Sequence, residues 1–453
     1  MSEETGFHWT NWNRNLSCVA DRYQPGSLDE LCENVRAAAK NGRVRPIGNS
    51  CSWSPLIPTT GSLIDLSRLT RVLAMNDTGN PPSVRVECGV SMRELVRFTE
   101  THGLSIISPT IFQGVAMGGA IAVAAHGTGL GKSTISDEVI AVSLVDAQGE
   151  VHQIEQHHGE ILDAARCSLG TLGVVYSATL KMSPAFNVHV EDRFISRKEV
   201  LSGLKDLLSS YEFVELYWFP FADTMWCKLM NRTHLPSDQE TCHGLTDDAI
   251  DYVATMFSGQ VILPFTARYL SWLTPIFAKI APFFAVRPGT RVEPSSTEFH
   301  YQAAYPKNWD MSWGVPLDQA VAAWEMSMEL VESYGRRQEY PINMVVHSRF
   351  IGASTALLSP AEGRAICDIE AVTCTGTPNI VPFYLEYTDK MLADFPTARP
   401  HWGKYLLRPD QIRSRYPKMD AFLAHRKALD PDGVFLNDFL EGSIFQLDPG
   451  ARR

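Results

Sequence analysis

The stretch that decides the fold is Gly114-Val-Ala-Met-Gly-Gly-Ala-Ile-Ala-Val-Ala-Ala-His-Gly-Thr-Gly129, which is rich in glycine and alanine. Two shorter segments of the same kind lie before and after it, Pro46-Ile-Gly-Asn-Ser-Cys-Ser-Trp53 and Leu169-Gly-Thr-Leu-Gly-Val-Val175. Small residues let backbone N–H groups approach a pyrophosphate or a flat ring without a side-chain clash. Each segment alone could equally be a turn, but the three together are a more specific signal of such a site.

The sequence motifs of several other kinds of functional site are absent or incomplete. The run from Ala125 to Ser133 invites a P-loop interpretation, but that motif needs a glycine where the chain has His126. No clear apolar strand runs into this segment either. The sequence contains no HExxH, no GxSxG and no Rossmann GxGxxG. It therefore gives no support to a metal site or to acyl-transfer chemistry.

The length, net charge and cysteine pattern of the chain indicate its number of domains and exclude some classes of partner. The chain has 453 residues, which suggests two or three domains. A formal net charge of −11 repels phosphate backbones, so nucleic acid is not an expected partner. The nine cysteines are scattered without a CxxC pair, and the first residues hold no apolar signal-peptide run. Free thiols and a cytoplasmic location are the expectation.

One apolar stretch, Gln260 to Val286, resembles a membrane segment at first sight. It contains Arg268 and Lys279, and its longest uncharged run, Tyr269 to Ala278, is half of the roughly 20 residues that a spanning helix needs. We expect no transmembrane helix but a buried or interfacial helical pair, with membrane-surface or dimer contact as an open alternative. The polar residues before it, 237–251, are expected to form a loop.

The remaining pattern alternates helix and strand signals over the first 180 or so residues. Val139–Val145 and Val151–Glu155 are expected to form a hairpin, and Phe213–Phe219 an aromatic strand. Helices are expected over 318–334 and 409–429.

The three small-residue segments resemble the flavin domain of the vanillyl-alcohol-oxidase type of FAD enzymes, most closely the aldonolactone and alditol oxidase branch, the sugar-1,4-lactone oxidases. Pro400-His-Trp-Gly-Lys404 is similar to the C-terminal HWGK signature of that family, and the segment Asp430 to Asp438 resembles its closing segment. Trp313-Gly-Val-Pro316 looks like the start of a helix in the substrate domain. The resemblance covers most of residues 15–440 and is weakest at 230–300.

The resemblance implies an α+β flavoprotein with an FAD-binding PCMH-type domain over 1–185. It also implies a substrate domain over 186–415, built on an antiparallel sheet, and a C-terminal segment, 416–453, that returns to the FAD domain. The residues implied to bind FAD are Ile47, Gly48, Asn49, Ser50, Cys51, Ser52, Ala116, Met117, Gly118, Gly119, Ala122, His126, Gly127, Thr128, Gly129, Gly173, Val174 and Lys404.

Two positions in the implied flavin site depart from the family. Many members link a histidine of the first loop to the flavin 8α-methyl group, and here the matching residue is Cys51. A histidyl link is impossible, so we expect FAD without a covalent bond; a cysteinyl link is the alternative. Where alditol oxidases have a serine facing the substrate, this chain has Ala116, which loses one hydroxyl contact and favours a less polar substrate.

The segment that corresponds to the family's catalytic strand also differs from the family. Where the family has a Glu-x-Arg pair, this chain has His347-Ser-Arg349. Residues two apart on a strand share a face, so both side chains point one way. Arg349 could then stabilise developing negative charge, and His347 could accept the hydroxyl proton. The alternative is a histidine that only satisfies a buried polar contact. Losing the carboxylate puts a polyol or sugar-lactone substrate in doubt.

Lys404 of the HWGK segment is implied to hold the substrate oxygen or the reduced flavin, although a lone lysine is more often a surface charge. One or two of five aromatic residues are expected to line the substrate pocket, with the rest in the core: Tyr217, Trp218, Phe383, Tyr384 and Tyr387.

The implied reaction is oxidation of a CH–OH group of a small-molecule alcohol by hydride transfer to flavin N5, with O₂ or another electron acceptor. Two alternatives stay open. One is a dehydrogenase of the same fold that uses a non-oxygen acceptor. The other is a flavin-binding protein without turnover, or an enzyme that tailors a secondary metabolite.

Overall fold

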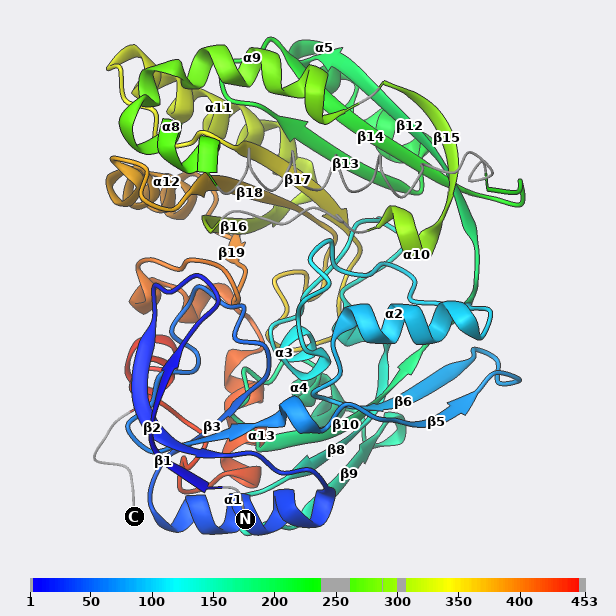
Figure 1. The fold of residues 1–453 in the computed structure, drawn as a ribbon, viewed down its shortest axis with the longest axis vertical. Helices are drawn as coiled ribbons and strands as arrows, with labels where there is room; N and C mark the ends of the chain where they lie inside the picture. The colour runs from blue at the N-terminus through cyan, green and yellow to red at the C-terminus, as the bar shows by residue number, and fades with distance from the viewer. Residues whose placement is uncertain (1–2, 238–260, 287, 300–306, 448–453) are drawn as a thin grey trace.

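The computed structural model describes residues 3–237, 261–286, 288–299 and 307–447. Figure 1 shows a large sheet in the upper half of the molecule and two smaller sheets in the lower half. The first 180 or so residues, coloured from blue through cyan, lie in the lower half. The C-terminal helix α13 (Met419–Leu429) lies among those N-terminal elements.

The N-terminal half is built on a mixed sheet and an antiparallel sheet. The mixed sheet has the order β1-β2-β4-β3, in which β4 pairs in parallel with both of its neighbours. Its strands are β1 (Glu3–Thr10), β2 (Ser17–Tyr23), β3 (Val44–Ile47) and β4 (Ser62–Asp65). The antiparallel sheet has the order β5-β6-β10-β8-β9. Its strands are β5 (Val72–Asn76), β6 (Ser83–Glu87), β8 (Val139–Val145), β9 (Val151–Glu155) and β10 (Val174–Lys181).

The other half is built on one eight-stranded antiparallel sheet with the order β15-β12-β14-β13-β17-β18-β16-β19. Its central strands are almost fully buried, as expected for a sheet covered on both faces. The strands are β12 (Asn187–Ser196), β13 (Phe213–Trp218), β14 (Thr224–Thr233), β15 (Gly289–Pro294), β16 (Asn308–Pro316), β17 (Val345–Ile351), β18 (Ile366–Cys374) and β19 (Arg399–Pro400). The strands β7 (Leu104–Ser105) and β11 (Ser183–Pro184) form a separate two-stranded sheet.

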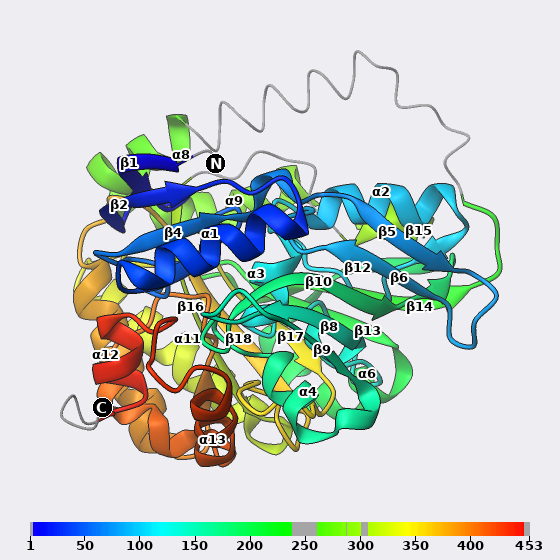
Figure 2. The same ribbon diagram turned by 90° about the horizontal axis from the view of Figure 1, so that it is seen from below.

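Helices cover the sheets on both halves. In Figure 2 α1 runs alongside β4, which it also contacts, and in Figure 1 α8, α9, α11 and α12 lie over the large sheet. The helices are α1 (Leu28–Lys40), α2 (Met92–Thr101), α3 (Met117–Ala122), α4 (Glu160–Ala165), α5 (Arg197–Ser202), α6 (Leu204–Ser210), α8 (Leu263–Tyr269), α9 (Thr274–Ala285), α10 (Ser295–Glu298), α11 (Ala320–Arg336) and α12 (Ile380–Asp394), besides α13.

The buried guanidinium of Arg45 on β3 ties distant segments of the N-terminal half together. Its Nε donates to the carbonyl of Leu56 at 2.8 Å, and its two Nη atoms donate to Gly170 at 2.8 Å and Leu169 at 2.6 Å. It also donates to the carbonyl of Phe435. Burial lowers the pKa of Arg45 to about 9, which still leaves it charged at neutral pH. The residues that flank the first small-residue segment, the third segment and the C-terminal segment therefore meet at one side chain.

One helix expected from the sequence is broken. Residues 409–429 contain two 3₁₀ turns, Pro409–Gln411 and Arg413–Arg415, and only then α13. Pro417 explains the break, because a proline has no N–H to give and restricts the residue before it.

The other expected elements have mixed outcomes. The hairpin of β8 and β9 and the aromatic strand β13 are confirmed. Trp313–Pro316 is the end of strand β16, not the start of a helix, although α11 follows shortly after it. The expected loop at 237–251 lies outside the described residues from 238 onward. The helical pair within 260–286 is confirmed as α8 and α9.

Candidate active site

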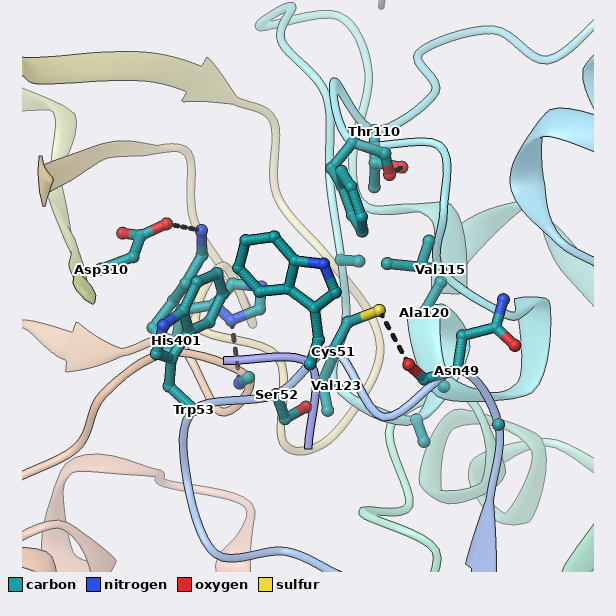
Figure 3. A pocket seen from close by; sticks show the side chains of 18 of the residues that line it. Asn49, Cys51, Ser52, Trp53, Thr110, Val115, Ala120, Val123, Asp310 and His401 are labelled. Carbon is teal, nitrogen blue, oxygen red and sulfur yellow. Dashed lines mark hydrogen bonds and ion pairs between the residues drawn. The ribbon is translucent and has the colours of Figure 1, made fainter. Parts of the chain in front are cut away.

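A cavity of about 430 Å³ lies between the small-residue segments and the large sheet. Its walls come from the first segment, from the start of α3, and from strands β13, β16, β17 and β18. Figure 3 shows Asp310 and His401 on one side of this pocket and Asn49, Val115 and Ala120 on the other. The cavity therefore brings together residues that are more than 300 positions apart in the chain.

Most residues proposed from the sequence line this cavity. They come from all three small-residue segments, from strand β17 and from the HWGK segment. They are Ile47, Gly48, Asn49, Ser50, Cys51, Ser52, Ala116, Gly118, Gly119, Ala122, His126, Gly173, His347, Arg349 and Lys404.

Five of the residues proposed for FAD do not line the cavity: Met117, Gly127, Thr128, Gly129 and Val174. Gly129 and Thr128 instead join their loop to the large sheet, whereas Gly127 lies against Ser108, whose Oγ would clash with an added Cβ. The N–H of Gly129 donates to the carbonyl of Phe350 on β17 at 2.6 Å, and Thr128 Oγ1 donates to the carbonyl of Val214 on β13 at 2.6 Å. Met117 and Val174 are fully buried in the core.

The wall formed by the small residues has room for a flat group. A Cβ atom added at Gly119 would meet no atom within 4 Å, so this position opens into the cavity. A Cβ at Gly48 would lie 2.6 Å from the Cβ of Ala116, so the first and second segments touch there. Neighbouring Gly118 differs, because a Cβ there would approach Cys88 at 3.0 Å. This smooth, glycine-rich wall fits a flavin ring and its pyrophosphate.

Cys51 lies at the edge of this wall with its sulfur directed toward the carbonyl of Asn49 (Figure 3), to which Sγ donates at 3.3 Å. Burial raises the pKa of the Cys51 thiol to about 12, against a small opposing effect of Lys307. The thiol is therefore protonated at neutral pH, and a protonated thiol is a poor nucleophile.

Five charged or titratable side chains meet at the wall formed by the large sheet, around the carboxylate of Glu370 on β18. Glu370 Oε2 lies 3.2 Å from Nε2 of His347 and 2.9 Å from Nζ of Lys404. Its Oε1 accepts a hydrogen bond from Arg349, and Lys404 also bonds Asp310 of β16. His347 and Glu370 are directly opposite in the β17–β18 register, which explains their contact.

These contacts set the charge states of the cluster. Burial alone raises the pKa of Glu370, but Arg349 and Lys404 outweigh it and hold the pKa well below its usual range. Burial alone lowers the pKa of Lys404, but Asp310 and Glu370 hold it above its usual range. Burial raises the pKa of Asp310 to about 6, although Lys404 opposes this. At neutral pH the cluster therefore holds ionised Glu370 between two cations.

Several polar atoms of this wall have no hydrogen-bond partner among the described residues. They are buried and belong to side chains that line the cavity, and a bound molecule could satisfy them. These atoms are Nδ1 of His347, Nε of Arg349, Oδ1 of Asp310 and Oδ1 of Asn308.

A second group of titratable residues lies beside the cluster. His126 Nε2 is 3.4 Å from the carboxylate of Asp368, and its ring is 5.4 Å from that of His401. Nδ1 of His401 accepts the N–H of Gly403 at 3.0 Å. Burial and the neighbouring His126 lower the pKa of His401 to about 3, so this ring is neutral. The His401 ring therefore adds no positive charge next to Lys404.

Of the aromatic residues considered from the sequence, only Tyr217 lines the cavity. Its ring stacks on His347, with centroids 5.4 Å apart and planes 14° apart, and on Trp226 at 4.3 Å. Trp218, Phe383, Tyr384 and Tyr387 are in the core, as was expected for most of them.

Sequence reasoning missed Glu370, Asp310 and Asp368. One signal was available for two of them: Asp368 and Glu370 are two apart in Ile366–Cys374, a largely apolar strand that is buried throughout. Two carboxylates on one face of such a strand are expensive to bury unless cations meet them. The partners themselves could not be read from the sequence, because strand register is non-local.

Comparisons with known proteins show the family to which the chain belongs. The D-arabinono-1,4-lactone oxidase family model matches residues 178–443, and an FAD binding domain model matches residues 22–155. An L-gulono-1,4-lactone dehydrogenase of Mycobacterium tuberculosis is 30% identical over 95% of this chain and 97% of its own length. An L-gulonolactone oxidase of Scyliorhinus torazame is 27% identical over 97% and 99%.

A crystal structure of a cholesterol oxidase from B. sterolicum superimposes with a TM-score of 0.79 over 97% of this chain and 96% of its own, at 17% identity. This likeness shows the fold alone. The α+β, FAD-binding PCMH-type fold and the resemblance seen in the sequence motifs are thereby confirmed. The chain belongs to the D-arabinono-1,4-lactone oxidase family and is an FAD-dependent oxidoreductase that acts on CH–OH groups.

Proposed function

We propose that the substrate is a sugar-1,4-lactone and that its CH–OH group is oxidised at the charged wall of the cavity. The observation that carries this proposal is the set of buried polar atoms without partners on His347, Arg349, Asp310 and Asn308. A polyhydroxylated ring can satisfy such atoms, whereas a sterol or a long alkyl chain would leave them unpaired at a cost. The names of the relatives, which are gulonolactone and arabinonolactone enzymes, support the same substrate class.

The doubt about a lactone substrate that arose from His347 loses its basis here. The carboxylate missing from β17 is supplied by Glu370 on the neighbouring strand, in contact with both His347 and Arg349. An acidic group is therefore present at the site, although it comes from a different strand.

Each catalytic side chain has a proposed role. The small-residue segments that line the cavity would hold FAD, and bound FAD would supply the acceptor for a hydride from the substrate carbon. His347 donates Nε2–H to Glu370, which leaves Nδ1 as the basic nitrogen that accepts the hydroxyl proton. Arg349 and Lys404 bind substrate oxygens and stabilise negative charge as it develops. Glu370 fixes the ring of His347 and keeps both cations in place.

Turnover with purified enzyme tests the substrate class. We expect activity with L-gulono-1,4-lactone or D-arabinono-1,4-lactone in the presence of an artificial dye acceptor, and little with a sterol or a long-chain alcohol. The reverse preference would refute the lactone proposal. The same assay without dye, in air or under nitrogen, distinguishes oxygen from a non-oxygen electron acceptor.

We expect FAD to be held without a covalent bond, because Cys51 replaces the usual histidine and its thiol is protonated at neutral pH. Acid or heat denaturation should release all of the flavin into the supernatant. Flavin fluorescence that stays with the protein band on a denaturing gel would contradict this prediction.

Gly119→Val should lower FAD occupancy strongly, because its side chain would enter the cavity where the flavin lies against the backbone. The readout is the ratio of flavin to protein absorbance in the purified, folded variant. Gly442→Val is the matched control, because a Cβ there also meets no atom within 4 Å but lies outside the cavity. Full flavin content in soluble Gly119→Val would mean that this loop is a structural turn.

We further propose a cytoplasmic location and the domain division at 185 and 415. The eight cysteines in the described ranges are unpaired, which supports a reducing compartment. All strands of the large sheet lie between residues 187 and 400, which supports the division.

A further inference from the structure

The surface of α8, α9 and the 3₁₀ turn between them (Ser271–Leu273) is unusually apolar for a part exposed to solvent. Among the described residues, 14 large hydrophobic side chains are exposed, and eight of them fall between residues 261 and 280. Monomeric soluble proteins rarely expose such a concentration unless it binds something. The eight are Val261, Ile262, Phe265, Tyr269, Trp272, Ile276, Phe277 and Ile280, and we call them the apolar patch.

The charged residues on α8 and α9 themselves are of one sign. Arg268 on α8 and Lys279 on α9 are both exposed. No acidic residue occurs in the sequence between Asp251 and Glu293, although the whole chain carries a formal net charge of −11. This segment is thus basic and apolar within a chain of net negative charge, and its two cations complement an anionic partner.

The two helices are too short to cross a bilayer. At 12 residues α9 is about 18 Å long, against a hydrocarbon core of about 30 Å. Among the described residues, no helix has the length and apolar character of a membrane span. Short helices with aromatic residues on one face and basic residues nearby instead lie in the plane of the membrane interface. Trp272 and Tyr269, which are 61% and 63% exposed, are the residue types enriched there.

We propose that α8, the 3₁₀ turn and α9 dock onto a membrane surface that carries anionic headgroups. The apolar patch enters the boundary between headgroups and acyl chains, and Arg268 and Lys279 pair with lipid phosphates. In Figure 1 α9 lies at the opposite end of the molecule from α1, so docking leaves the N-terminal sheets away from the lipid. A second copy of the chain fits less well, because a symmetric contact would bring two basic patches together without acidic partners.

Vesicle sedimentation of the flavin-containing protein tests this proposal. We expect binding to vesicles of phosphatidylcholine with phosphatidylserine, weaker binding to phosphatidylcholine alone, and loss of the difference at 1 M salt, where the screening length falls to about 3 Å. Arg268→Gln and Lys279→Gln should each lower the partition coefficient by about fivefold on the anionic vesicles.

The double variant Phe265→Glu with Trp272→Glu should lower the partition coefficient by at least about tenfold, since two large side chains can no longer be buried. The matched control, Leu73→Glu with Val151→Glu, changes two exposed apolar residues on β5 and β9 and should bind as wild type does. Flavin content confirms that both variants fold.

Three results would overturn the proposal. The first is an absence of binding to anionic vesicles, and the second is an equal loss of binding in the patch variant and its control. The third is a wild-type dimer, seen by light scattering, that the patch variant converts to a monomer while neither protein binds vesicles. That last result would assign the patch to contact between two copies.

Discussion

His347→Ala is expected to slow reduction of the bound flavin by about 10²–10⁴-fold, the range for removal of a positioned general base. His347 is the one side chain of the cluster whose basic nitrogen, Nδ1, lacks a partner among the described residues while its other nitrogen is held by Glu370. Flavin content should stay near that of wild type, because the ring belongs to the wall formed by the large sheet.

His347→Gln is the matched variant for this prediction. Its amide can still donate to Glu370, but it offers no basic nitrogen, so it should be as slow as the alanine variant. Rates are measured by anaerobic stopped flow and normalised to bound flavin. If the rate of flavin reduction falls by less than about tenfold in both variants, His347 only lines the pocket and is not the general base.

Glu370→Ala is expected to destabilise the protein by about 3–5 kcal/mol, the usual cost of removing one partner from a buried ion pair. Glu370 is only 2% exposed, and without it Arg349 loses its carboxylate partner and Lys404 keeps only Asp310. The rate of flavin reduction should fall as well, because His347 and both cations are no longer held.

An exposed ion pair provides the control for the stability measurement. Glu329 pairs with Arg336 on α11, and both side chains are at least 60% exposed. Glu329→Ala should change the free energy of unfolding by no more than about 1 kcal/mol. Equal shifts in the denaturant midpoints of the two variants, with FAD present, would show that Glu370 is not the centre of the charged cluster.

The sequence predicted the parts of the site that lie on local patterns. Small residues recur within each of the three segments, and the two-residue period of a strand places His347 and Arg349 on one face. His347, Arg349 and most of the small residues do meet at the cavity, whereas Gly127, Thr128 and Gly129 do not line it. Cys51 and Lys404 were found through the family resemblance of the motifs that contain them, and both line the cavity.

What the sequence could not give depends on contacts between distant segments. Glu370 meets His347 only because β17 and β18 pair in one particular register, and Asp310 meets Lys404 only because the HWGK segment passes β16. Gly129 belongs to a glycine-rich motif, yet the fold uses it to bond β17 and not to line the cavity. Such assignments follow from tertiary packing, on which local spacing carries no information.

Anaerobic mixing of the purified enzyme with L-gulono-1,4-lactone or D-arabinono-1,4-lactone tests the central claim most directly. We predict that at least one lactone bleaches the visible absorbance of the bound flavin within a single turnover, and that His347→Ala bleaches far more slowly at equal flavin content. A wild-type flavin that stays oxidised with both lactones, yet is reduced at once by dithionite, would contradict the account.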